Sequence, residues 1–65
     1  MTSQPTTPTL EPLLSIKRTA DHCDVSEKTV RRWIDNGELP AAKLGGQWRI
    51  RPRDLEMFVF ERLQR

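Results

Sequence analysis

The stretch from Val25 to Gly37 constrains the fold most, because it marks both ends of a short helix. Ser26 is a favoured N-cap residue, and Glu27 places negative charge in the first turn, where the helix dipole favours it. Asn36 followed by Gly37 supplies the left-handed backbone conformation at which helices stop. A helix is therefore expected between Ser26 and Asn36.

The apolar residues of this stretch fall on one side of the predicted helix. Val30, Trp33 and Ile34 are spaced i, i+3 and i+4, which predicts a stripe that faces a core. The other faces carry cations and a hydroxyl group, from Lys28, Thr29, Arg31 and Arg32. Arginine and lysine bind guanine edges and phosphates in the DNA major groove, so the helix suits insertion there. The alternative is a solvated amphipathic helix, because charged outer faces are common.

A shorter helix is expected just before it, over Ile16 to about Cys23, with Ser15 as its N-cap. The residues predicted to face inward are Ile16, Ala20 and Cys23, with Thr19 bordering this stripe. Asp24 tolerates the left-handed conformation, so it fits a tight turn before the next helix. Two short helices joined by so tight a turn predict a helix-turn-helix, in which the second helix reads DNA.

A β-hairpin is expected after the second helix. Leu39 is predicted to enter the core, and residues 41–51 look like two strands around Gly45-Gly46. A two-residue loop would mix apolar and charged residues on each face, whereas a three-residue loop over residues 45–47 with a bulge separates them. We therefore predict the longer loop, with Leu44, Trp48 and Ile50 on the body and Lys43, Arg49 and Arg51 facing away. Such a hairpin is either a cationic wing beside the reading helix or a stabilising element with solvated charges.

A last helix is expected to begin near Pro52, which suits a first helical position. Its core stripe is predicted to hold Leu55, Phe58, Val59 and either Arg62 or Leu63. Met57 and Phe60 lie off this stripe and are more apolar than a solvated face requires. They would either pack on the hairpin or body, which we favour, or contact a second protomer or a partner protein.

Size and composition limit the classes of function. The 65 residues make one small domain, expected over residues 13–65, and residues 1–12 are so rich in threonine and proline that they predict a flexible tail. With 35% hydrophobic residues, no apolar capacity is left for a buried catalytic pocket, so an enzyme is not expected. His22 and Cys23 supply too few ligands for a metal site, and no cofactor is predicted.

Positive charge is concentrated in the middle of the chain. Between Lys28 and Arg53 there are seven cationic and two acidic residues, a local net charge of +5 against +2 for the whole chain. Such an excess attracts polyanions, and nucleic acid before a membrane surface. Neither a transmembrane stretch nor a signal peptide is visible, so we expect a cytoplasmic, nucleoid-associated protein that does not bind a membrane.

The order of these parts closely resembles the excisionase-type, MerR-like winged helix-turn-helix family, a mainly α fold with a small β-hairpin. The motifs that carry the resemblance are LLSIK (13–17), VSEKTVRRWI (25–34), GELPA (37–41), KLGGQWRI (43–50) and DLEMF (54–58). It implies that the second helix enters the major groove and that the wing contacts phosphates or an adjacent minor groove. By position, the implied DNA-binding residues are Ser26, Lys28, Thr29, Arg31 and Arg32 in the helix, and Lys43, Gln47 and Arg49 in the wing.

Three functions follow from this reading. The first is an excisionase, or recombination directionality factor, which binds repeated sites in double-stranded DNA cooperatively, self-associates there and assists a tyrosine recombinase (integrase). The second is a small transcriptional regulator that uses the same fold at promoter repeats, which the sequence does not separate from the first. The third is a protein-interaction adaptor that uses Met57 and Phe60, with the basic helix merely solvated.

Overall fold

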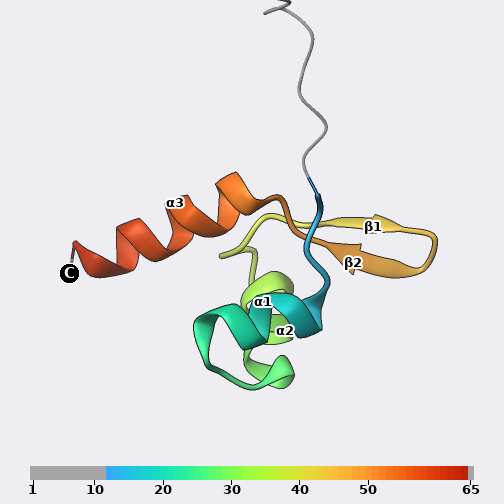
Figure 1. Cartoon of the computed structure of the whole chain (residues 1–65), viewed down its shortest axis with the longest axis horizontal. Coiled ribbons are helices and arrows are strands. Elements are labelled where there is room, and N and C mark those ends of the chain that lie inside the picture. The colour runs from blue at the N-terminus through green and yellow to red at the C-terminus, as the bar shows by residue number, and fades with distance from the viewer. Residues whose placement is uncertain (1–11, 65) are drawn as a thin grey trace, which may run out of the picture.

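The computed structural model describes residues 12–64, and within that range the chain forms three helices and a two-stranded antiparallel hairpin (Figure 1). The elements are α1 (Ile16–Cys23), α2 (Glu27–Asp35), β1 (Ala42–Leu44), β2 (Gln47–Arg49) and α3 (Pro52–Leu63). The predicted order of helix, turn, helix, hairpin and helix is confirmed. The predicted tail over residues 1–12 falls almost entirely outside the described residues, so the domain boundary stays a prediction.

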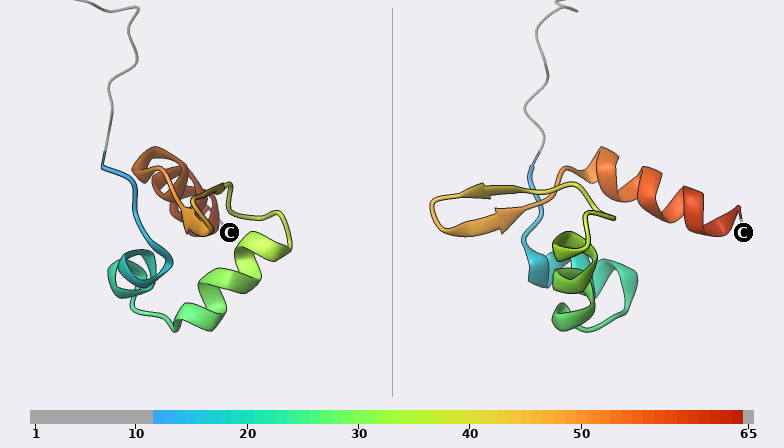
Figure 2. Two further views of the ribbon diagram at one scale, coloured as in Figure 1. Left: turned by 90° about the vertical axis from the view of Figure 1, so that its right-hand side faces the viewer. Right: turned by 180° about the vertical axis from the view of Figure 1, so that it is seen from behind.

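The helix pair α1–α2 lies below the level of the hairpin and α3 in Figure 1, and these two elements project in opposite directions. The hairpin extends toward one end of the molecule and α3 toward the other. The left view of Figure 2 shows the side from which the hairpin projects, and α2 lies side-on across it. One side of the molecule therefore presents both the second helix and the hairpin.

Serine caps start both helices of the pair, as predicted. The hydroxyl of Ser15 accepts a hydrogen bond from the backbone N–H of Arg18 at 3.0 Å, and that of Ser26 accepts from Thr29 at 3.1 Å. Asp24 sits between the helices with φ 58°, in the left-handed conformation expected of it. The chain therefore turns from α1 into α2 within a few residues.

The end of α2 follows from Asn36-Gly37. Gly37 has φ 77°, and its N–H donates to Ile34 O at 3.0 Å, while the N–H of Glu38 donates to Trp33 O at 2.9 Å. This pair of bonds is the Schellman arrangement, in which a left-handed glycine satisfies the last helical carbonyls. The chain leaves the helix here and carries Leu39, which is 1% exposed, into the core as predicted.

The predicted three-residue hairpin loop is wrong. Ala42 pairs with Arg49, Lys43 with Trp48 and Leu44 with Gln47, so the loop contains only Gly45 and Gly46. Both glycines have positive φ, 58° and 82°, which is the backbone of the two-residue turn whose twist matches that of paired strands. Turn geometry thus decided the register, and it outweighed the sorting of side chains between the two faces.

The observed register places the hairpin side chains differently from the prediction. Lys43 lies on the same face as Trp48, and its ammonium sits 5.5 Å from the centre of the indole ring. A lysine can share an apolar face in this way, because its methylene stem packs on the ring while the charge remains in solvent and is attracted to the ring face. Leu44, predicted to pack on the body, is 51% exposed beside the turn.

A short segment before α1 pairs with the chain just after β2. Leu14 and Ile50 exchange both backbone hydrogen bonds, each 2.8 Å long, in an antiparallel bridge. This bridge makes the Leu13-Leu14 stretch a minimal edge strand. Ile50 is completely buried at this point, so the pairing fixes the root of the hairpin to the start of the helix pair.

The core takes residues from every helix and from both connections around the hairpin. It consists of Ala20, Val30, Ile34, Leu39, Ile50, Leu55 and Phe58. Trp33 covers it from α2, with its ring 4.7 Å from that of Phe58 at an interplanar angle of 47°. The predicted stripe of α2 is confirmed. Thr19, expected beside the stripe of α1, is instead fully buried.

The second half of α3 extends beyond the core. Val59, predicted on its core stripe, is 37% exposed. For the last position of the stripe, Leu63 is 75% exposed, whereas the alternative, Arg62, stacks on the ring of Phe58. Met57 and Phe60 are 54% and 56% exposed, so the favoured prediction that they pack on the hairpin or body is wrong. The reason is the direction of α3, whose C-terminal end projects beyond the α1–α2 pair (Figure 1).

Two phenylalanines on α3 provide a matched test of this packing. We expect Phe58→Ala to lower the free energy of unfolding by about 3–5 kcal/mol, because it removes a buried ring and leaves a cavity. Phe60→Ala should cost less than about 1 kcal/mol, because its ring is largely in solvent. Urea unfolding followed by tryptophan fluorescence measures both changes. Equal losses for the two variants would contradict the packing described.

The buried hydroxyl of Thr19 provides a second test. Its Oγ1 has no hydrogen-bond partner among the described residues, and an unsatisfied buried hydroxyl is costly. Thr19→Val, which keeps the shape, should leave stability unchanged or raise it by up to about 1 kcal/mol. Thr29→Val is the control and should destabilise, because the Thr29 hydroxyl lies 2.9 Å from that of Ser26. Thermal unfolding compares the two, and a clear loss for Thr19→Val would contradict this interpretation.

Candidate nucleic-acid interface

The outward face of α2 carries three exposed cations, Lys28, Arg31 and Arg32. They fall on one face because they are spaced i, i+3 and i+4, and burial of Val30 and Ile34 turns that face toward solvent. The ion pairs found within residues 12–64 join Lys17 to Asp21, Arg51 to Asp54 and Arg62 to Glu38. None of these pairs involves the cations of α2, which therefore remain available for an external anion.

Ser26 and Thr29 lie at the start of the same helix, but capping occupies them in part. Ser26 Oγ accepts the backbone N–H of Thr29, and the two hydroxyl oxygens are 2.9 Å apart. Ser26 is exposed and Thr29 is half-buried. The structure thus gives both residues a role within the helix start, at the end where backbone N–H groups and the helix dipole favour an anion.

The three predicted wing residues do not share one face of the hairpin. Gln47 and Arg49 project from the same side of β2, because they are two residues apart, while Lys43 lies with Trp48 on the opposite side. Arg49 is half-buried, and its Nη1 donates to the backbone oxygen of Trp48 at 3.0 Å while its Nη2 donates to Gln47 Oε1. The guanidinium of Arg49 is therefore held against its own strand.

Arg51, predicted on the outer face of the wing, belongs instead to the start of α3. It is the residue before the first helical position, and its Nε and Nη2 donate to the two carboxylate oxygens of Asp54 at 2.8 and 3.0 Å. The sequence carried a signal for this pair, since the two residues are three apart across a helix start. The prediction overlooked it because Arg51 was assigned to the hairpin.

Helix α2 and the hairpin are both exposed on one side of the molecule. The left view of Figure 2 faces the projecting hairpin, and α2 crosses that side without another helix or strand in front of it.

A contact from α3 fixes the segment that follows α2. Arg62 donates to Glu38, and its guanidinium carbon stacks 4.5 Å from the centre of the Phe58 ring. Sequence reasoning missed this contact, because the two residues are far apart in the chain.

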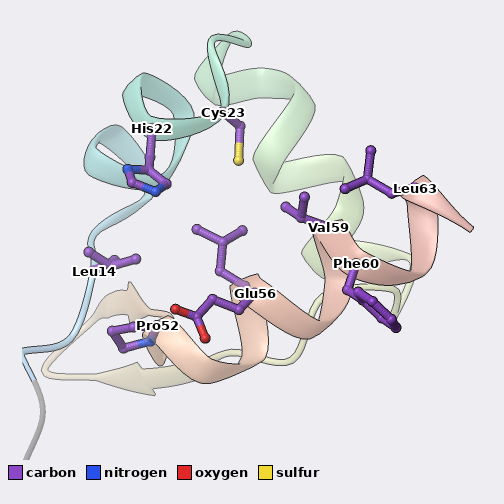
Figure 3. Close-up of a pocket in the computed structure, with 9 residues that line it drawn as sticks. Leu14, His22, Cys23, Pro52, Glu56, Val59, Phe60 and Leu63 are labelled. Atoms are coloured by element: carbon purple, nitrogen blue, oxygen red, sulfur yellow. The ribbon is translucent and has the colours of Figure 1, made fainter.

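An apolar groove of about 640 Å³ lies between the end of α1 and one side of α3 (Figure 3). Figure 3 shows the thiol of Cys23 pointing into it and His22 at its edge, with Val59 and Leu63 on the facing helix. No group of three or more potential metal-binding side chains occurs among the described residues. Burial raises the pKa of the Cys23 thiol above its ordinary value, which makes the thiol less reactive.

A helix pair with a short turn, a hairpin beside the second helix and unpaired cations on that helix define a class of DNA-binding protein, the helix-turn-helix proteins. The chain belongs to the helix-turn-helix domain family, whose model matches residues 13–62. This is a DNA-binding and not an enzymatic family, in agreement with the prediction from composition. The resemblance to winged helix-turn-helix proteins is likewise confirmed.

Two curated proteins are similar to this chain. A transcriptional repressor, DcmR of Methylorubrum extorquens (strain DSM 6343 / CIP 106787 / DM4), is 47% identical over 51 residues, which are 75% of this chain and 19% of the repressor. An excisionase of Mycobacterium phage D29 is 58% identical over 31 residues, which are 48% of this chain and 55% of the excisionase. The chain thus spans less than two thirds of each relative. No solved structure matches it significantly. Among the described residues, no helix has the length and apolar character needed to span a membrane.

The position of Cys23 leads to a prediction about its reactivity. A maleimide should modify Cys23 more slowly in the folded protein than in urea, because burial keeps the thiol protonated near the ordinary thiol pKa of about 8.5. Because burial disfavours the thiolate, the free energy of unfolding should fall as pH rises from the unfolded-state pKa through the folded-state pKa of Cys23. Mass spectrometry of timed samples measures both rates. Equal rates would contradict the burial of this thiol.

Proposed function

We propose that this chain binds double-stranded DNA with sequence specificity, with α2 in the major groove and the hairpin on the adjacent backbone. The observation that carries the proposal is the set of three cations on α2 that are exposed and make no ion pair within residues 12–64. Helix α2 and the hairpin are both exposed on the side of the molecule from which the hairpin projects, which supports the proposal that one duplex meets both elements. A helix held by its apolar face and charged on its outer face is what groove insertion requires.

The residues divide into two groups under this proposal. Arg31 and Arg32 are assigned to base edges, since arginine binds guanine through two parallel hydrogen bonds. Lys28, Ser26 and Thr29 bind phosphates near the start of α2, and Lys43, Gln47 and Arg49 act from the wing. These two groups contain five cations in all, and their approach to the duplex should release about five counterions, so the logarithm of the binding constant should fall with the logarithm of salt concentration at a slope of roughly −4 to −5.

The cellular role that we propose is that of an excisionase, which binds repeated sites cooperatively and assists a tyrosine recombinase on the DNA of the nucleoid. The support is the similarity to the excisionase of Mycobacterium phage D29, at 58% identity over 31 residues. The small size of the domain also supports it, since one module buries little DNA surface and useful specificity then needs several bound copies. A second copy on neighbouring DNA and the recombinase are the proposed protein partners.

A second candidate role is transcriptional repression. The observation that favours it is the longer alignment with the repressor DcmR, which covers 75% of this chain. Both roles use the same DNA-binding surface, so they differ in where the sites lie. DNase footprinting on the chain's own genomic neighbourhood separates them: repeated sites beside a recombinase gene and its attachment sequence support the excisionase role, and sites over a promoter support repression.

Variants of α2 test the assignment of base reading. Arg31→Ala or Arg32→Ala should weaken discrimination between the cognate and a mismatched site by about 1–3 kcal/mol, because each removes a bidentate base contact. Arg53→Ala is the matched control: it removes an exposed cation from α3 and should leave discrimination unchanged. Gel-shift titrations on both duplexes provide the measurement. If both α2 variants weaken binding evenly on all sequences, the helix positions the protein but does not read bases.

A further inference from the structure

We propose that Gln47 is a positioning residue for Arg49, and that the guanidinium it holds binds a single backbone phosphate. This inference rests on the proposed DNA binding and gives two wing residues distinct tasks. The resemblance implied that both side chains contact DNA directly. The contacts within the hairpin indicate that, of these two residues, only Arg49 contacts DNA directly.

The first step is the fixed geometry of β2. Gln47 and Arg49 lie two residues apart on one strand, so their side chains leave the same face. Arg49 folds back along the strand, with Nη1 on the carbonyl of Trp48 and Nη2 on Gln47 Oε1. Ala42, which is opposite Arg49 in the register, has too small a side chain to displace it. The guanidinium is therefore held by a backbone group and a side-chain group together.

The second step is a count of donors. A guanidinium has five N–H groups in one plane, and two of those of Arg49 are used inside the hairpin. The remaining N–H groups lie in the same plane, so the two internal bonds also fix their direction. A guanidinium oriented before binding loses less side-chain entropy on contact with an anion. Arg49 is half-buried rather than extended, so it suits a phosphate that approaches the hairpin and not a base deep in a groove.

The third step concerns Gln47 itself. Glutamine reads adenine through a donor and an acceptor at once, with Oε1 receiving a hydrogen bond from the adenine amino group. In the hairpin Oε1 accepts from Arg49 instead. Oε1 has a second lone pair, but the bond to Arg49 turns the carboxamide toward the guanidinium, so the contribution of Gln47 to DNA binding passes through Arg49.

A double-mutant cycle tests this inference. Gln47→Met keeps the length of the side chain, and Arg49→Met keeps only its apolar stem. Both remove the hydrogen-bonding groups, and neither residue belongs to the buried core. Arg49→Met should weaken binding evenly across sequences and reduce the salt slope by about one. Gln47→Met should weaken binding about three- to ten-fold in the wild-type background, and by less than about two-fold when Arg49 is already Met. Fluorescence anisotropy with a labelled duplex at several salt concentrations measures all four proteins.

The outcomes separate this inference from the proposed function. Additive losses would mean that Gln47 contacts DNA itself and would overturn the positioning role. Unchanged affinity for Arg49→Met would also overturn it, whereas the proposed function would still stand if Arg31→Ala and Arg32→Ala relaxed specificity. If the wild-type chain does not bind DNA at all, the proposed function itself is wrong.

A measurement on the free protein adds a readout that does not depend on DNA. In the wild type, the two internal bonds should slow rotation of the Arg49 guanidinium group, which nitrogen-15 NMR of arginine side chains detects. Gln47→Met should speed that rotation, while Gln47→Glu, which retains an acceptor oxygen, should keep it slow. Identical rotation rates in the wild type and Gln47→Met would contradict the clamp.

Discussion

The burial of Val30 and Ile34 in α2 is the constraint on which the rest of the structure depends. Successive residues of a helix are separated by a fixed angle. Once Val30 and Ile34 lie in the core, the helix cannot rotate about its axis, and the direction of every other side chain is set. Lys28, Arg31 and Arg32 must then face solvent. The Schellman turn after α2 and the contact between Trp33 and Phe58 hold the helix in this orientation. The functional surface is thus a direct consequence of core packing.

Three cations outside α2 and the hairpin have carboxylate partners, whereas the cations of α2 have none within residues 12–64. Lys17, Arg51 and Arg62 each pair with a carboxylate within the described residues. Exposed pairs of this kind contribute little to stability, but they neutralise the cations that take part in them. On α2 and the hairpin the cations face solvent, an indole ring or a neutral acceptor, so positive potential is concentrated there. The modest net charge of the whole chain conceals this local excess.

Local signals made most of the fold predictable from the sequence. The serine caps, Asp24, Gly37 and the apolar spacing of α2 act within one or two helical turns, and each predicted the observed geometry. The hairpin register was not predicted correctly, because side-chain sorting was weighted above the preference of two glycines for a two-residue turn. The exposure of Val59 and Leu63 depends on the direction of α3 in space, which no local pattern specifies. For the candidate site, the helix cations follow from periodicity, whereas the hold of Gln47 on Arg49 becomes visible only in the correct register.

The central claim is that α2 and the hairpin form one surface for a single duplex. Titration of the nitrogen-15-labelled chain with a short duplex, followed by backbone amide chemical shifts, tests it most directly. We expect large shift changes together in residues 26–32 and 43–49, with the exposed second half of α3 little affected. Changes confined to α3, or to only one of the two elements, would contradict a shared DNA-binding surface.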